Sequence, residues 1–169
     1  MEKDFKRWSI KKEKLDNRIN TPFVNERDIF WCSIGINVGD EENGKSDLFS
    51  RPVLVFKKFN QNLFWGIPLS TKNKDNIYYV QVKFKDNMSS VLISHLRLYD
   101  VKRLIFRIGK LHKSEFNKII GSIINLIPRS SSEDLGGRLS VDLYNDNIMN
   151  EYLESNLNLD IASPNINRF

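Results

Sequence analysis

With 169 residues, 40% of them hydrophobic, the chain is long enough for one domain with a packed core, and its composition excludes a disordered chain. A single cysteine, Cys32, excludes an intrachain disulfide, and a charged start with no long apolar run excludes a signal peptide and a membrane span, so we expect a cytoplasmic protein. The net charge is +5, but residues 1–128 hold 23 Lys/Arg against 14 Asp/Glu, whereas residues 129–169 hold three against seven, which predicts a polyanion-binding body and an acidic extension.

The first predicted element is a helix over residues 3–19, covered with Lys and Arg. Its apolar residues fall near one stripe: Phe5, Trp8, Leu15 and Ile19. Two interpretations are open, a helix docked on the body through Trp8 or a helix in direct contact with a nucleic acid, and the first is favoured. Because Thr21-Pro22 ends the pattern, residues 1–22 are interpreted as a basic N-terminal extension.

Between residues 26 and 110 the hydrophobic pattern changes to period two in short runs, which is typical of strands. The predicted strands cover residues 28–38, 52–57, 63–69, 77–84, 91–96 and 103–108. Polar turns rather than helices join them, so we predict a mainly β fold built as a small antiparallel barrel.

A second helix is expected to begin at Ser114, which caps it, and to end before Pro128. The main domain is therefore predicted to span residues 23–128. Residues 129–169 form the acidic C-terminal extension, which opens with a serine-rich linker and contains one possible amphipathic helix over residues 140–157.

The hairpin between the second and third predicted strands sets two polar side chains opposite each other. Its turn is centred between Asn60 and Gln61, so Arg51 and Ser70, equally far from that point, should face each other. Their Cβ atoms are then about 5 Å apart, provided that no bulge shifts the register. This predicts a cation beside a hydroxyl at one end of the sheet, next to the glycine loop 39–44.

Five short segments occur in a characteristic order and spacing. They are Gly39-Asp40-Glu41-Glu42-Asn43-Gly44, Arg51-Pro52-Val53-Leu54-Val55, Ile67-Pro68-Leu69-Ser70-Thr71, His95-Leu96-Arg97-Leu98-Tyr99-Asp100 and Lys102-Arg103-Leu104. None of them is diagnostic alone. Together they resemble the pattern of the MazF/PemK toxins over about residues 27–127.

This resemblance implies a homodimer of SH3-like β-barrels that cleaves single-stranded RNA, such as mRNA, at short sequence motifs through the 2′-hydroxyl, without a metal or cofactor. It also implies a cognate antitoxin. The catalytic arginine of the family matches Arg51, and its catalytic threonine matches Ser70, with Thr71 as the substitute if the register slips by one. The acidic loop residue of the family matches Glu41. Its Gln-x-Arg segment matches His95 and Arg97, which we take as candidates for catalysis or RNA binding.

These residue types fit the expected reaction. An arginine stabilises the extra negative charge of a phosphorane-like transition state through two parallel donors, and a serine hydroxyl can bind the same phosphate. An unassisted hydroxyl is a poor base, so the general base is left open. His95 is either that base, a donor that reads an RNA base, or a partly buried hydrogen-bonded histidine, and the last is favoured. Taken alone, Arg51 would be a salt-bridge partner for Glu41 or Glu42.

Other functional classes are less well supported. The sequence has no carboxylate cluster, CxxC pair, HExxH motif or P-loop, which argues against a metal-dependent nuclease. One alternative is a DNA gyrase poison of the CcdB type, which needs neither Arg51 nor Ser70. Another is a toxin-derived RNA-binding module without activity. The acidic extension has two further interpretations, an inhibitor in cis that competes with RNA, or a solvated end, which is favoured.

Overall fold

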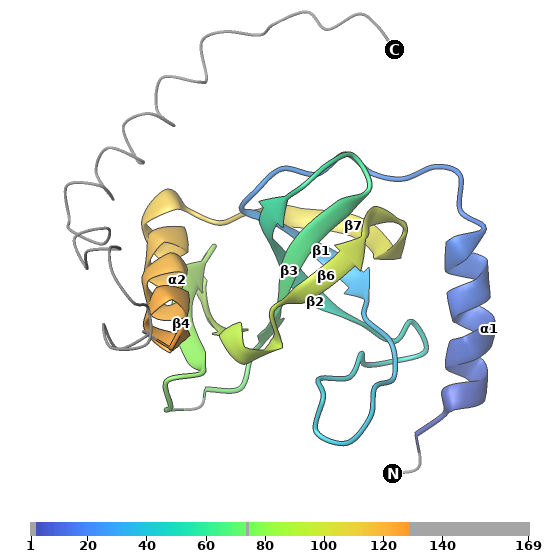
Figure 1. The fold of residues 1–169 in the computed structure, drawn as a ribbon, viewed down its shortest axis with the longest axis horizontal. Helices are drawn as coiled ribbons and strands as arrows, with labels where there is room; N and C mark the ends of the chain where they lie inside the picture. The colour runs from blue at the N-terminus through green and yellow to red at the C-terminus, as the bar shows by residue number, and fades with distance from the viewer. Residues whose placement is uncertain (1–2, 74, 129–169) are drawn as a thin grey trace, which may run out of the picture. The chain divides into compact units, whose positions relative to one another are not determined.

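The computed structural model describes residues 3–73 and 75–128, so the predicted helix over residues 140–157 lies outside the described residues. The elements follow one another as shown in Figure 1. In chain order they are α1 (Phe5–Asp16), β1 (Asp28–Ser33), β2 (Ser50–Lys58), β3 (Leu63–Ser70), β4 (Tyr79–Phe84), β5 (Asn87–Leu92), the 3-10 helix η1 (Ile93–His95), β6 (Arg97–Asp100), the 3-10 helix η2 (Val101–Arg103), β7 (Leu104–Lys110) and α2 (Lys113–Leu126).

The strands form one antiparallel sheet of seven strands in the order β4-β5-β3-β2-β1-β7, with β6 paired to β3 off this path. Strand β3 is shared, because residues 63–66 pair with β6 and residues 69–70 pair with β5. The predicted mainly β, antiparallel architecture with flanking helices is confirmed. Among the described residues, however, β4 and β7 end the path without pairing to each other, so the curled sheet is not a closed barrel.

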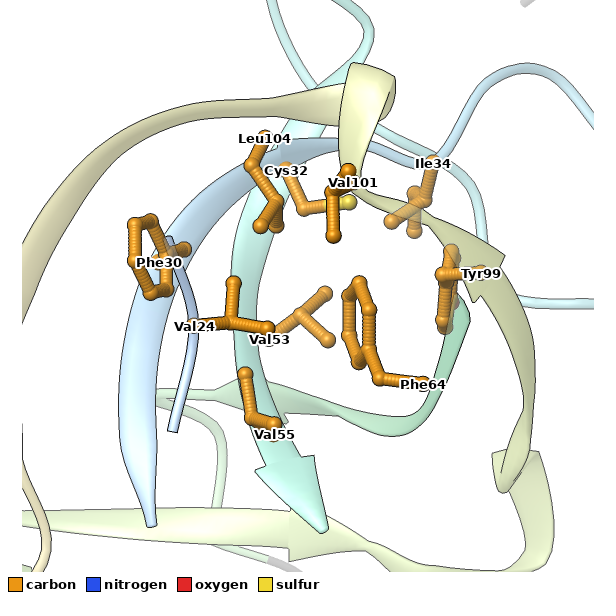
Figure 2. Packing of buried hydrophobic residues seen from close by; sticks show 10 residues of the cluster. All are labelled: Val24, Phe30, Cys32, Ile34, Val53, Val55, Phe64, Tyr99, Val101 and Leu104. Atoms are coloured by element: carbon orange, nitrogen blue, oxygen red, sulfur yellow. The ribbon is translucent and has the colours of Figure 1, made fainter. Parts of the chain in front are cut away.

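Alternating side chains give the curled sheet two cores. Phe30, Cys32, Val53 and Val55 point into the first core, which is shown in Figure 2 and also contains Phe64, Tyr99 and Leu104. Side chains on the opposite faces of the same strands, such as Ile29 and Leu54, enter a second core with Phe116 and Ile119 of α2. The period of two along β1 and β2 therefore buries both faces of these central strands.

Several predicted boundaries need correction. Helix α1 is shorter than predicted; its stripe keeps Trp8 and Leu15 buried, whereas Phe5 is 50% and Ile19 94% exposed. The predicted strand 91–96 is wrong over its second half, because Ile93–His95 turn as a 3-10 helix and the pairing segment begins earlier, at Asn87. Strand β6 was not predicted. The cap of α2 is His112, whose side chain accepts from the backbone N–H of Ser114, rather than Ser114 itself.

The β2–β3 hairpin has the predicted register at the end away from its turn, near Arg51 and Ser70, although a bulge is present. Near the turn, Lys58 faces Phe64, which centres the hairpin on Gln61 rather than before it. The irregularity between Val55 and Lys57 absorbs this offset, so Val53 faces Pro68 as predicted. The ladder contacts end there, and Arg51 and Ser70 follow two residues further along each strand.

Candidate active site

Cross-strand pairing places the candidate residues on the face of the sheet that also forms the first core. Directly opposed residues share a face, and Arg51 is opposite Cys32 of β1 while Arg97 is opposite Gly66 of β3. Ser70 lies two residues beyond Pro68, which faces Val53, so it has the same orientation by alternation. The sheet thus brings Arg51, Ser70 and Arg97 to one side, as the sequence predicted for the first two.

A long loop, residues 34–49, connects β1 to β2 over this end of the sheet. Two backbone hydrogen bonds join the ends of this loop at Gly35, Gly44 and Phe49, which we call its neck. The Gly35 N–H donates to Phe49 O at 3.0 Å, and the Gly44 N–H donates to Gly35 O at 2.8 Å. Position 44 requires glycine, since a Cβ atom there would lie 1.9 Å from the Phe49 carbonyl oxygen. The loop therefore has a defined base although it contains no regular secondary structure.

Arg51 is held by this loop. Its Nε–H donates to Asn43 O at 2.5 Å, and its Nη2 forms an ion pair with Glu42, while only 13% of its side chain is exposed. A guanidinium carries five donors in a fixed fork, and these two contacts use only its Nε–Nη2 side. The loop thus fixes the orientation of the guanidinium through its Nε and Nη2 atoms. The predicted salt bridge of Arg51 exists, and it is made by Glu42 rather than Glu41.

Two further arginines bond to the end of β1 and the start of the same loop. Arg97 donates to Ile34 O at 3.3 Å and to the Asn37 side chain at 3.4 Å, and its guanidinium lies over the ring of Tyr99, 4.8 Å from the centroid. Arg103 donates to Ser33 O at 3.2 Å. Three cations from β2, β6 and η2 therefore gather at one end of the sheet, an arrangement suited to binding a polyanion.

A cavity of about 240 Å³ lies beside Arg51. It is lined by Glu41, Glu42, Pro68, Ser94, His95, Leu96, Arg97 and Tyr99. Three of the candidates, Glu41, His95 and Arg97, thus share one cavity, and Arg51 is linked to it through Glu42. Donors and acceptors are mixed on its walls, as they are in sites that bind polar ligands.

The two candidate hydroxyls are placed differently. Ser70 is half-buried, and its Oγ accepts from the backbone N–H of Lys72 at 3.1 Å. Thr71 is exposed at the start of the connection to β4, and neither residue lines the cavity. Ser70 and Thr71 therefore lie outside the cavity, as Arg51 does, but Arg51 is joined to the cavity wall by its ion pair with Glu42.

Two residues of the site, Asn37 and Tyr99, were not among the residues singled out from the sequence, whereas Glu42 was named there as one of two possible partners of Arg51. Asn37 grips the far side of the loop, since its N–H donates to the Asn43 side chain and its Nδ2 donates to Glu42 O, both at 2.6 Å. The tandem Glu41-Glu42 was a signal for a carboxylate near Arg51. Which of the two reaches the guanidinium depends on the conformation of the loop, and an irregular loop leaves no periodic pattern in the sequence that would predict it.

Two buried groups near the arginines are poor candidates for proton transfer. Burial raises the pKa of the Cys32 thiol to about 12, and it also raises the pKa of Tyr99. The Tyr99 hydroxyl is buried without a hydrogen-bond partner among the described residues. Both groups therefore stay protonated at neutral pH.

Within residues 3–73 and 75–128, no group of three or more His, Cys, Asp or Glu side chains is placed to hold a metal ion. Over the same residues, none of the helices has the length and apolar character needed to cross a bilayer.

The fold is the one that MazF toxins adopt. The crystal structure of MazF from Deinococcus radiodurans matches with a TM-score of 0.53 and 19% identity, over 62% of this chain and 96% of that chain. A MazE–MazF crystal structure from the same organism matches with a TM-score of 0.50 and 16% identity, over 64% of this chain and 99% of that chain. At these identities the likeness shows the fold alone.

The sequence itself decides the family. Residues 25–127 match the model of the PemK-like, MazF-like toxins of type II toxin-antitoxin systems, and the chain belongs to this family. None of the curated proteins with which it was compared matches.

Proposed function

We propose that this protein is an endoribonuclease that acts as the toxin of a type II toxin-antitoxin system and cleaves single-stranded RNA without a metal ion. The observation that supports this most is the geometry of Arg51. Its guanidinium is fixed by Glu42 and Asn43 on one side, next to a cavity with Glu41, His95 and Arg97 on its walls. Donors fixed in advance stabilise a transition state more than flexible ones.

In the proposed reaction, the 2′-oxygen of a ribose attacks the adjacent phosphorus and the bond to the 5′-oxygen of the next nucleotide breaks. The 2′-hydroxyl gives its proton to a base, and the 5′-oxygen takes up a proton as it leaves. The products are a 2′,3′-cyclic phosphate and a 5′-hydroxyl. Arg51 stabilises the charge that builds up on the phosphate oxygens, and Ser70 positions the phosphate. Glu41 and His95 are the titratable side chains on the cavity wall that remain candidates for the base.

The test is incubation of purified protein with a mixed-sequence RNA in EDTA. We expect cleavage at short motifs, and no cleavage of an RNA that carries 2′-deoxyribose at the cut position. Continued cutting of the deoxy substrate would exclude the mechanism. Intact RNA together with inhibition of DNA gyrase would favour the CcdB-like poison, and intact RNA bound without cleavage would favour the inactive binding module.

We also propose a homodimer, a separately encoded or built-in inhibitor, and a cytoplasmic location. Support for an antitoxin partner comes from the family and from the MazE–MazF structure, in which a similar fold binds its antitoxin. The homodimer rests on the resemblance alone. Light scattering at high micromolar concentration tests it, because a monomer there would refute it.

A further inference from the structure

Helix α1 lies outside the matched family region, residues 25–127, yet it packs on the loop that holds Arg51. Its Trp8 covers Gly35, where a Cβ atom would lie 2.4 Å from the indole ring, and it meets Phe49 edge to face with ring centroids 5.6 Å apart. Gly35 and Phe49 are the two residues that bond across the neck of loop 34–49. Trp8 therefore closes the base of this loop.

Residues at the start of α1 also reach the loop beyond its neck, Lys3 from just before the helix and Arg7 from its first turn. The Lys3 ammonium donates to Asn37 O at 2.9 Å and to Gly39 O at 2.7 Å, and Arg7 pairs with Asp47 at 2.9 Å. Figure 1 shows the N-terminal end of α1 beside this connection. Loop 34–49 is thus held from one helix at its neck and at two points beyond the neck.

The opposite end of α1 is anchored on the sheet. Arg18, just after the helix, donates to Lys102 O at 2.8 Å and to Leu104 O at 2.6 Å, and Lys102 donates to Asp16 O at 2.6 Å. The guanidinium of Arg103 lies over the Trp8 ring, 5.6 Å from its centroid. Since α1 is fixed to η2 and β7 at this end, it can act as a rigid support for the loop.

A continuous series of contacts leads from α1 to Arg51. Lys3 holds the carbonyl of Asn37, whose backbone N–H and side-chain amide hold Asn43 and Glu42, the two residues that fix the Arg51 guanidinium. A long irregular loop would otherwise sample many conformations, and ordering it has an entropic cost. We propose that α1 is a built-in part of the active site, in which Trp8 and Lys3 are positioning residues that keep the loop, and through it Arg51, in the orientation needed for cleavage. This inference rests on the proposed function.

The same contacts weigh against α1 as a simple RNA-binding surface. Lys3, Arg7 and Arg18 each bond to the protein itself, so their donors are engaged within the molecule. A helix that only added positive charge would not need these directed bonds. In that case the loss of any one lysine of α1 would weaken RNA binding to a similar degree.

The experiment compares Lys3→Ala with Lys12→Ala, each of which removes one positive charge from the N-terminal segment, just before α1 and within α1 respectively. Lys12 is exposed on α1. We expect Lys3→Ala to lower the single-turnover cleavage rate at saturating RNA by about tenfold, because small misplacements of catalytic groups have effects of up to about 10²-fold. Lys12→Ala should cut at the wild-type rate. Affinity for a 2′-deoxy RNA should be the same for both variants.

Trp8→Ala is the stronger perturbation, and hydrogen exchange of the loop gives a readout that does not depend on catalysis. We expect faster exchange of the amides of residues 35, 44 and 49 in Trp8→Ala and Lys3→Ala, but not in Lys12→Ala. If Trp8→Ala does not fold, the comparison of Lys3 with Lys12 still decides. Unchanged exchange and unchanged rate in Lys3→Ala would overturn the inference, as would equal losses of RNA affinity in both lysine variants.

The two proposals fail in different ways. If Arg51→Ala retains wild-type cleavage, the proposed function of Arg51 is wrong, whatever the exchange data show. If Arg51→Ala is inactive and Lys3→Ala exchanges faster but cuts normally, the proposed function stands and the role of α1 is rejected.

Discussion

Two connections border the site, and they are built differently. Loop 34–49, which leads into Arg51, is bonded across its neck and held by Lys3 and by side chains from α1, β2 and β6. In the connection from Thr71 to Tyr78, which follows Ser70, every described residue is exposed, and its contacts with β5 and η1 lie at its ends, at Lys72 O and Tyr78 O. The cation is therefore fixed in advance, whereas the hydroxyl lies at the root of a projecting segment. We expect Arg51, on the side of loop 34–49, to contribute more to catalysis than Ser70.

The largest expected effect is that of Arg51→Ala. Loss of one donor to the transition state typically lowers the rate by about 10²–10³-fold. Arg51→Lys should not restore full activity, because an ammonium lacks the two-pronged fork. The matched control is Lys57→Ala, on the exposed far half of β2, which should cut normally. Single-turnover cleavage is the measurement, with circular dichroism to confirm the fold; wild-type rates in Arg51→Ala would remove the site.

A second prediction concerns the neck of loop 34–49. Gly44→Ala places a methyl group against the Phe49 carbonyl, so we expect the neck to open and the cleavage rate to fall. Overpacking of this kind typically destabilises by about 1–3 kcal/mol, which thermal unfolding would detect. Gly39→Asn is the control, because position 39 has φ of +55° with nothing within 4 Å of a Cβ, and asparagine tolerates that conformation. Equal cleavage by the two variants would show that the neck does not matter.

Loss of either hydroxyl, Ser70 or Thr71, should lower the cleavage rate less than loss of Arg51. Ser70→Ala loses one hydrogen bond to the phosphate, and a net contribution of about 0.5–1.5 kcal/mol corresponds to roughly a twofold to tenfold drop in rate. Thr71→Ala should remain within about twofold of wild type, because its side chain is exposed at the margin of the site. Kinetics of both variants decide which hydroxyl acts in cleavage, since a larger effect at Thr71 than at Ser70 would assign the role to Thr71.

The smallest expected effect is that of His95→Gln. His95 is partly buried on the cavity wall, and we expect glutamine to support cleavage with an unchanged dependence on pH. A histidine base must be neutral to accept the proton of the 2′-hydroxyl, so it would give a rate that falls in a step toward acidic pH. A rate profile from pH 5 to 8 that loses this step only in the variant would identify His95 as the base.

The elements that the sequence predicted best are those with a periodic hydrophobic pattern. The patterns along residues 28–38 and 52–57 predicted the central strands, which the structure places at Asp28–Ser33 and Ser50–Lys58. Symmetry about the hairpin turn predicted the pairing of Val53 with Pro68, two residues before Arg51 and Ser70. The predicted pairing was correct because two one-residue shifts in register cancel. The turn is centred on Gln61 rather than before it, and the irregularity between Val55 and Lys57 shifts the pairing back. A one-residue bulge leaves no mark in the hydrophobic pattern, so the sequence could not indicate either offset.

The parts that were missed lack such a period. Strand β6, Arg97–Asp100, has only four residues, with Leu98 and Tyr99 side by side between two charged residues, so it shows no period-two pattern that separates it from a loop. The choice of Glu42 over Glu41 follows from the grip of Asn37 on the loop, a contact between residues that no spacing rule connects. The docking of α1 through Trp8 was predicted correctly, but its contact with loop 34–49 depends on the three-dimensional path of that loop.

The position of Cys32 directly across from Arg51 makes this thiol an internal probe of the site. It is buried, and its pKa is raised to about 12, so alkylating reagents at neutral pH should find almost no thiolate in the native state. Labelling then requires an opening of the first core that exposes Cys32 to solvent. Because Cys32 is the only cysteine in the chain, its alkylation rate measures the free energy of that opening in the wild-type sequence, without RNA and without an introduced label.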